Sequence, residues 1–174
     1  TFSLSLACLA LSMSSAWSMG KAPTAQEKQA TQQAQQSTQA SAKQSEQSCE
    51  RVLADFNKGQ LKSQIDVAQL SEIVRSLDSR KRLPDYFITK NQARELGWSP
   101  GTNFNSVAAL RGKSIGGDRF GNFERRLPQG QWQEADLDYR GKKRNAKRLV
   151  FSRNGERYVT IDHYDTFKKV PACQ

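Results

Sequence analysis

The sequence is short of the residues on which several kinds of site depend. It has one histidine and three cysteines in 174 residues, too few for a structural zinc site once Cys8 is lost with a leader segment. No apolar run is long enough for a comfortable membrane span, because residues 2–13 are interrupted by serine. The segment 112–118, "GKSIGGD", has Val107 where a phosphate-binding loop requires its first glycine. These absences disfavour a zinc domain, a spanning helix and a nucleoside triphosphatase.

Charge is distributed unevenly along the chain. Residues 1–78 carry seven basic and seven acidic side chains, which leaves 20 of the 27 basic and 10 of the 17 acidic groups in residues 79–174. The whole formal net charge of +10 therefore belongs to the second part of the chain. A compact basic region predicts a polyanionic partner, which is nucleic acid, an anionic membrane surface or an acidic protein. A basic surface without a specific partner has the same composition and stays open as an alternative.

Local composition predicts three segments. Residues 1–18 are uncharged and apolar with small residues near their end, which predicts the remnant of a secretory signal peptide; a membrane anchor is the alternative. Residues 19–47 form a linker rich in Gln, Ala and Ser, which we expect to be disordered or transiently helical. Residues 48–174 carry the apolar periodicity of a folded domain.

Two cysteines remain after residues 1–18 are removed. An even number of cysteines in an exported chain favours a disulfide, here between Cys49 and Cys173. The bond would tie the start of the folded domain to its C-terminus. Two unpaired thiols near the chain ends are the alternative.

Hydrophobic spacing predicts helices first and strands after them, which is an α+β layout. Asp66 is a suitable N-cap for one helix, and Thr89 with Gln92 forms a capping box for the next. Asn154-Gly155 predicts a hairpin. The expected helices lie near 49–56, at 66–77 and at 89–97, and the expected strands lie at 131–139, 146–153, 156–162 and 166–170.

The strand at 131–139 concentrates acidic side chains. Strict alternation places Glu134, Asp136 and Asp138 on one face, where they repel unless cations lie opposite. The segment 140–148 supplies six basic residues, so the sequence predicts a strongly basic antiparallel neighbour. An ordinary ion-pair network explains this pattern. The alternative is a phosphate site with an ionised carboxylate beside it.

His163 follows the predicted hairpin, and the meander can bring it close to Glu134. A carboxylate, an imidazole and several cations suffice for metal-free RNA cleavage. The carboxylate takes the proton of the ribose 2′-hydroxyl, the imidazolium protonates the departing 5′ oxygen, and the cations stabilise the charged phosphorane.

Five motifs in this sequence resemble those of the secreted microbial ribonucleases of the barnase type, in the same order and at similar spacing. They are "LPDYFITKNQARELGW" (83–98), "GKSIGGDRFGN" (112–122), "WQEADLDY" (132–139), "RNAKR" (144–148) and "DHYDTF" (162–167). The resemblance implies two or three N-terminal helices packed on a five-stranded antiparallel sheet.

The resemblance also implies roles for individual residues. Glu134 matches the general base and His163 the general acid. The groups implied to surround the reactive phosphate are Lys90, Arg144 and Arg148, with Tyr164 lining the cleft and Asp118 and Asp136 supporting it.

The base-recognition loop implied by the resemblance is 120–126, "FGNFERR". Glu124 matches a glutamate that accepts hydrogen bonds from guanine N1–H and the exocyclic amine, and Phe120 and Asn122 also match. Phe123 occupies the place of an arginine that contacts substrate and inhibitor. Lys143 replaces an aromatic residue near the base, while Arg125 and Arg126 add charge from shifted positions.

The implied activity is cleavage of single-stranded RNA 3′ of guanosine to a 2′,3′-cyclic phosphate, followed by hydrolysis to a 3′-phosphate, without a cofactor. The implied partner besides RNA is a small acidic protein inhibitor of the barstar type. We expect a monomer that has no membrane attachment in its mature form and is secreted, to the periplasm or outside the cell. A non-catalytic basic module that binds nucleic acid is the alternative, and a toxin aimed at competitors would use the same chemistry.

Overall fold

The computed structural model describes residues 25–173, so the predicted signal-peptide remnant at 1–18 lies outside the described residues. Within 25–173, no helix combines the length and apolar character needed to cross a bilayer. The elements in chain order are α1 (Ala25–Gln60), α2 (Val67–Arg80), β1 (Phe87–Ile88), α3 (Lys90–Glu95), η1 (Phe104–Ser106), η2 (Ala108–Leu110), β2 (Ser114–Phe120), β3 (Trp132–Asp136), β4 (Arg148–Ser152), β5 (Arg157–Thr160) and β6 (Lys168–Lys169).

The chain divides into one unit up to Ala40 and a second from Ser41 onward. In the first unit, residues 25–40 belong to helix α1, and their side chains are exposed from residue 28 onward. The sequence predicts disorder or a transient helix over 19–47, and the structure has a helix from residue 25. Gln, Ala, Lys and Glu lose little side-chain entropy in a helix, which explains how a segment without a core adopts this form.

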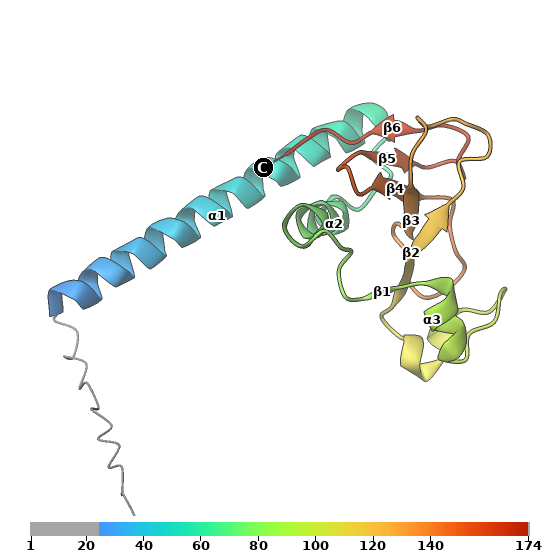
Figure 1. Cartoon of the computed structure of the whole chain (residues 1–174), viewed down its shortest axis with the longest axis horizontal. Helices are drawn as coiled ribbons and strands as arrows, with labels where there is room; N and C mark the ends of the chain where they lie inside the picture. Colours follow the sequence, from blue (N-terminus) through green and yellow to red (C-terminus); the bar gives the residue numbers. More distant parts are fainter. Residues whose placement is uncertain (1–24, 174) are drawn as a thin grey trace, which may run out of the picture. The chain divides into compact units, whose positions relative to one another are not determined.

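The second unit contains a six-stranded sheet with the order β1-β2-β3-β4-β5-β6 (Figure 1). Strands β2 to β6 are antiparallel neighbours, as the resemblance implies. The resemblance implies five strands, and the additional one is β1, which pairs with β2 in parallel through Phe87 and Ile88. Two residues carry no recognisable alternation, so the sequence does not predict this strand. The α+β architecture is confirmed.

The basic segment 140–148 is placed differently from the prediction. Strand β4 begins only at Arg148, so the other cations of this segment lie in the connection that precedes it rather than on a strand. Asp138 likewise leaves the face of Glu134, because the chain turns there with a φ of 55°. Its carboxylate instead accepts from Lys147 at 2.8 Å.

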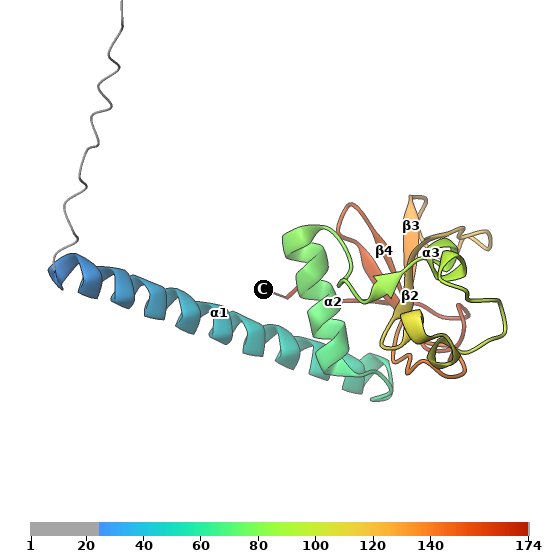
Figure 2. The same cartoon turned by 90° about the horizontal axis from the view of Figure 1, so that it is seen from below.

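The main core joins the helices to one face of the sheet, and Figures 1 and 2 show α2 beside the central strands. Helix α1 contributes Leu53 and Phe56 from its last turns, and the β3 contribution is Ala135. The buried partners from α2, β4 and β5 are Leu70, Ile73, Val74, Leu77, Leu149, Phe151 and Val159. This packing leaves the opposite face of β3, which carries Glu134, available for chemistry.

The predicted starts of α2 and α3 are confirmed by their caps, whereas α2 runs on to Arg80 and α1 extends beyond the predicted 49–56 at both ends. The Asp66 side chain accepts from the Gln69 N–H, and Thr89 forms the capping box with Gln92. Gly97, with a φ of 96°, follows the end of α3 as expected of a helix stop.

The two glycines of "GKSIGGD" shape strand β2. A Cβ on Gly116 would lie 2.6 Å from a ring carbon of Phe87, so only glycine fits under this side chain. Gly117 has a φ of 92°, and the register with β3 shifts between Gly116 and Asp118. The glycines therefore form a bulge, which places Asp118 opposite Glu134 on the site face.

The predicted disulfide between Cys49 and Cys173 is present and closes a loop with a sequence separation of 124. It joins helix α1 to the C-terminal tail. Cys49 is buried in the main core.

Reducing this disulfide is expected to lower the free energy of unfolding by up to about 4–5 kcal/mol, because the open chain gains entropy when a long loop is released. Urea denaturation with and without reductant measures the difference. The Cys49→Ser/Cys173→Ser variant is the control, since its stability should not respond to reductant. Equal stability of the oxidised and reduced wild-type protein would contradict the expectation.

Candidate active site

The centre of the candidate site is the carboxylate of Glu134 on strand β3. Glu134 is 7% exposed and has two hydrogen-bond donors. Lys90 Nζ lies 2.8 Å from Oε1, and the Tyr164 hydroxyl donates to Oε2 at 2.6 Å. One oxygen is thus oriented by α3 and the other by the loop after β5.

These contacts keep the Glu134 carboxylate ionised. Burial alone would raise its pKa, but the hydrogen bonds from Lys90 and Tyr164 and the charges of Lys90 and Arg148 lower the pKa below its ordinary value. Burial and the neighbouring Glu134 carboxylate raise the pKa of Tyr164, so its hydroxyl remains a donor. Glu134 is therefore a proton acceptor at neutral pH.

Asp136 lies two residues along β3 and fixes two guanidinium groups. Arg144 approaches it in a bidentate manner, with Nε at 2.6 Å from Oδ2 and Nη2 at 2.7 Å from Oδ1. Arg148 Nε lies 3.0 Å from Oδ1, and both Asp136 and Arg148 are almost completely buried. Asp136 and Arg148 are also register partners on β3 and β4. This geometry is consistent with the prediction that Asp136 supports the site through an ion pair.

Asp118 connects α3 to strand β2. Its carboxylate accepts from the backbone N–H of Lys90 at 3.0 Å, the first residue of the helix. This hydrogen bond holds the start of α3 beside Glu134, so that the Lys90 side chain reaches Oε1 of Glu134.

His163 is exposed and lies in a turn after β5. Its ring centroid lies 4.9 Å from that of Tyr164, whose hydroxyl contacts Glu134. Tyr164 thus contacts both His163 and Glu134, while His163 itself is not among the residues that line the pocket at Glu134.

The turn has an unusual backbone. His163 and Tyr164 both have positive φ, at 58° and 75°, a region that residues with a side chain rarely occupy. Asp162 accepts from the Thr160 hydroxyl at 2.8 Å and from the Thr166 N–H and hydroxyl at 2.9 and 2.6 Å. The Thr160 hydroxyl in turn accepts from the Tyr164 N–H. Burial opposes ionisation of Asp162, but these hydrogen bonds lower its pKa to about 2.

A pocket of about 290 Å³ adjoins the carboxylate of Glu134. Its lining residues are Arg119, Phe120, Gly121, Asn122, Phe123, Glu124, Arg126, Glu134, Tyr164 and Phe167. Phe120 stacks on Tyr164 with ring centroids 5.2 Å apart, which gives the pocket an aromatic floor. All five residues predicted to bind substrate are thus gathered beside the predicted base.

The loop of this pocket is organised from within. The Asn122 side chain donates to the Leu127 carbonyl and accepts from the Leu127 N–H, so it supports the loop. Arg126 Nε lies 2.6 Å from Glu124 Oε2, and Arg126 also contacts Asp165. Glu124, the predicted guanine acceptor, is consequently paired with an arginine of its own loop.

Two departures from the resembled pattern are solvent exposed. Phe123 is 95% exposed, although it borders the pocket, and Lys143 is exposed and does not line it. The structure thus brings the predicted base loop to Glu134, and the exposed ring of Phe123 lies over Gly121, where a Cβ would clash with it.

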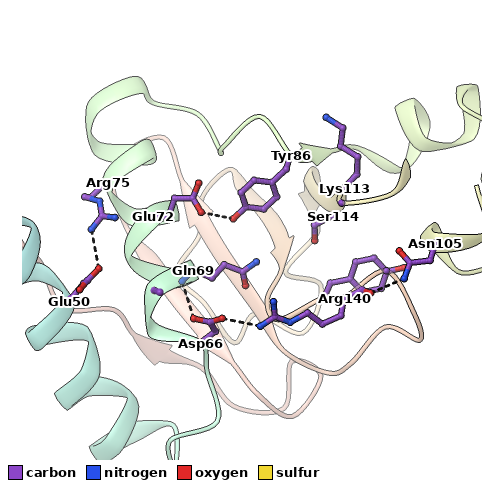
Figure 3. A pocket seen from close by; sticks show the side chains of 14 residues that line it. Glu50, Asp66, Gln69, Glu72, Arg75, Tyr86, Asn105, Lys113, Ser114 and Arg140 are labelled. Atoms are coloured by element: carbon purple, nitrogen blue, oxygen red, sulfur yellow. Dashed lines mark hydrogen bonds and ion pairs between the residues drawn. The ribbon is translucent and has the colours of Figure 1, made fainter. Parts of the chain in front are cut away.

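A second pocket, of about 640 Å³, lies beside α2 and contains none of the predicted site residues (Figure 3). Its lining has three acidic and three basic side chains, most of which have a partner within the pocket, while Lys113 donates to the Asp85 carbonyl. The pairs are Asp66 with Arg140 at 3.1 Å, Glu72 with the Tyr86 hydroxyl at 3.3 Å and Glu50 with Arg75 at 3.9 Å. This mutual neutralisation distinguishes it from the site at Glu134. Across residues 25–173, no group of three His, Cys, Asp or Glu side chains is arranged as metal ligands.

Sequence reasoning missed the residues that hold the site from behind. Asp162 enters the sequence prediction only as part of the motif "DHYDTF", although an Asp followed four residues later by Thr166 is typical of a side-chain-capped turn. Arg126 was considered only as a replacement charge, and Phe167 of the pocket lining was not singled out. Arg126 contacts Asp165, and Phe167 packs on Phe120; both contacts join segments far apart in the sequence, so nothing local indicates them.

Comparison of the sequence with known proteins identifies related chains. A family model described as ribonuclease matches residues 71–171. Proteins named Ribonuclease from Heyndrickxia coagulans, Bacillus intermedius and Bacillus pumilus are each 50% identical over 93 residues, which are 52% of this chain. The matched part covers 84% of the first relative and 57% of each of the other two.

The stability supplied by Asp162 is expected to depend on pH. Because its folded pKa of about 2 lies below the ordinary value of 3.8, its contribution is fully present above about pH 4 and is lost as the pH falls towards 2. The difference in unfolding free energy between wild type and Asp162→Asn should therefore shrink from pH 5 to pH 2. Thr166→Val, which removes one donor, should reproduce part of the effect. A difference that stays constant over this range would argue against the assignment.

Proposed function

The chain belongs to the ribonuclease family, and on that premise we propose that its cleft cleaves single-stranded RNA on the 3′ side of guanosine. Membership of the family makes the chain an endonuclease that hydrolyses RNA. The observation that carries the finer proposal is the buried Glu134 carboxylate, kept ionised between Lys90 and Tyr164 and next to two fixed arginines.

In the first step, Glu134 takes the proton from the 2′-hydroxyl of the ribose. The 2′ oxygen attacks the adjacent phosphorus, and the bond from phosphorus to the 5′ oxygen of the next nucleotide breaks. His163, as the imidazolium, protonates that departing oxygen. The product is a 2′,3′-cyclic phosphate. In the second step the roles are exchanged, because water must lose a proton and the 2′ oxygen must regain one.

The cations of the site stabilise the extra negative charge on the phosphorane. Arg144 and Arg148 are already held by Asp136, so their guanidinium groups need no reorganisation during the reaction. Lys90 forms an ion pair with Glu134 in the free enzyme. When RNA binds, its ammonium group would also stabilise the charge of the reactive phosphate beside Glu134. Neither step requires a cofactor.

The pocket beside Glu134 would receive the guanine base. Phe120 and Tyr164 offer an aromatic surface for stacking, and Glu124 offers a carboxylate for N1–H and the exocyclic amine. Guanine must displace Arg126 from Glu124, an exchange that is feasible because the Glu124 side chain is 71% exposed and exposed ion pairs contribute little.

We also propose an exported monomer whose activity is contained inside the producing cell by a small acidic inhibitor. The +10 charge supports fast, salt-sensitive association with an acidic protein. The exposed Phe123, in place of an arginine, alters the surface that such an inhibitor would contact.

Glu134→Gln and His163→Ala are each expected to lower the turnover of the dinucleotide GpU by about 10²–10⁴-fold, because each removes one proton transfer. The assay measures release of the cyclic phosphate in the presence of a chelator, which should have no effect. Glu156→Gln, a carboxylate change at the hairpin outside the cleft, is the matched control and should leave turnover unchanged. RNA binding should persist in all three variants. Undiminished cleavage by either cleft variant would refute the proposed roles and favour a non-catalytic binding module.

Glu124→Ala is expected to reduce the preference for GpU over ApU by about 5- to 150-fold, the value of a bidentate base contact of about 1–3 kcal/mol. The measurement is the ratio of kcat/KM for the two dinucleotides. Arg126→Ala keeps the acceptor and removes its competitor, so this variant should retain the preference. Equal losses on GpU and ApU after Glu124→Ala would mean that Glu124 does not read the base.

A further inference from the structure

We propose that a third pocket, at the ends of β2, β3 and β4, binds phosphodiester groups of the RNA on the 5′ side of the recognised guanosine. The inference rests on the proposed function and extends it from one nucleotide to a longer stretch of substrate. The pocket has a volume of about 410 Å³, and its lining residues are Arg119, Gln131, Trp132, Gln133 and Arg153.

The strand register explains why these side chains meet. Arg119 on β2 is the partner of Gln133 on β3. Arg153 directly follows Ser152, the β4 residue that pairs with Trp132. The two arginines therefore flank the start of β3 from either side, about 10 Å apart by strand spacing. Their flexible side chains can converge on a group between them.

The charge of this pocket is uncompensated. Arg119 and Arg153 are both exposed, and among residues 25–173 neither forms an ion pair or a hydrogen bond through its guanidinium group. The lining contains two glutamines and a tryptophan but no carboxylate. This differs from the pocket beside α2, where acids and bases neutralise each other. Two like charges on one pocket repel, and a phosphate that accepts hydrogen bonds from both would relieve the repulsion.

The position of the pocket indicates which part of the RNA it meets. The cations proposed to hold the reactive phosphate lie at the Asp136 end of β3, whereas this pocket lies at the Trp132 end. The base pocket adjoins Glu134 and shares Arg119 with this one. Because side chains alternate along a strand, Arg119 and its partner Gln133 leave the sheet on the face away from Glu134, so the RNA would pass around the end of β2 to reach this pocket. Since the reactive phosphate is on the 3′ side of the guanosine, a chain that continues past the base towards Arg119 is the 5′ side.

The test compares GpU with the 5′-extended ApApGpU and the 3′-extended GpUpApA. Wild type should cleave ApApGpU with a higher kcat/KM than GpU. Arg153→Ala should reduce this gain by about two- to fivefold, as expected for one exposed ionic contact, and Arg119→Ala/Arg153→Ala should reduce it further. A plot of the logarithm of kcat/KM for ApApGpU against the logarithm of salt concentration gives the salt dependence. Its slope should become shallower by about 0.7 for each phosphate group that a variant no longer binds.

Arg51→Ala is the matched control. Arg51 is an exposed arginine of α1, which borders β6 at the opposite edge of the sheet, so the variant removes the same charge away from the pocket. It should keep the full gain from 5′ extension, and no arginine variant should change the ratio of GpUpApA to GpU.

The outcomes separate the two proposals. Failure of wild type to cleave GpU or either tetranucleotide would overturn the proposed function. Cleavage of GpU by wild type, together with an undiminished 5′ gain in the double variant, would overturn the subsite alone. An equal loss on GpUpApA would also overturn it, because the arginines would then act through general charge.

Discussion

The buried ion cluster around Asp136 is the interaction on which the site depends. An isolated carboxylate this deeply buried would be strongly unfavourable, and Arg144 and Arg148 offset the cost by enclosing it. The same contacts fix both guanidinium groups on the face of β3 that carries Glu134, where the charge of Arg148 helps to lower the Glu134 pKa. Removing Asp136 would thus leave the buried Arg148 without its ion-pair partner and would loosen the cations beside Glu134. Stability and chemistry share one set of bonds here.

The two halves of the site are held in different ways. Glu134 stands on a central strand between β2 and β4, where pairing on both sides makes the backbone rigid. His163 stands in a turn where it and Tyr164 occupy the left-handed region, at a cost of about 1–3 kcal/mol each. Asp162 and Thr160 hold that turn by side-chain hydrogen bonds. The Tyr164 hydroxyl then joins the turn to Glu134, so this tyrosine links the two residues that we propose as base and acid.

The sequence predicts whatever depends on local spacing. Near neighbours in the chain predict the caps at Asp66 and Thr89, and the structure has both. They also predict the alternation that places Glu134 and Asp136 on the same face of β3. The roles of Glu134 and His163 came from motif order, which carries no geometry. Local patterns could not reveal β1, since two residues show no period, or the exit of Asp138 from its strand. They also gave no indication of the Arg126–Glu124 pair, because its geometry depends on how the whole loop closes.

That pair also determines what base recognition must achieve. In the proposed function, guanine would meet a Glu124 carboxylate that Arg126 already neutralises, so the base would gain only the difference between its own two hydrogen bonds and the ion pair that it displaces. Water screens the exposed ion pair between Arg126 and Glu124. A base that stacks on Phe120 would exclude water from its own contact with the Glu124 carboxylate. In the proposed function, the exchange would therefore favour guanine once stacking has occurred. A base that stacks equally well but has no paired donors leaves Arg126 in place and gains nothing from Glu124. In the proposed function, selectivity in this loop would consequently arise from stacking and hydrogen bonding together, with Arg126 as the competitor that only a base with paired donors replaces.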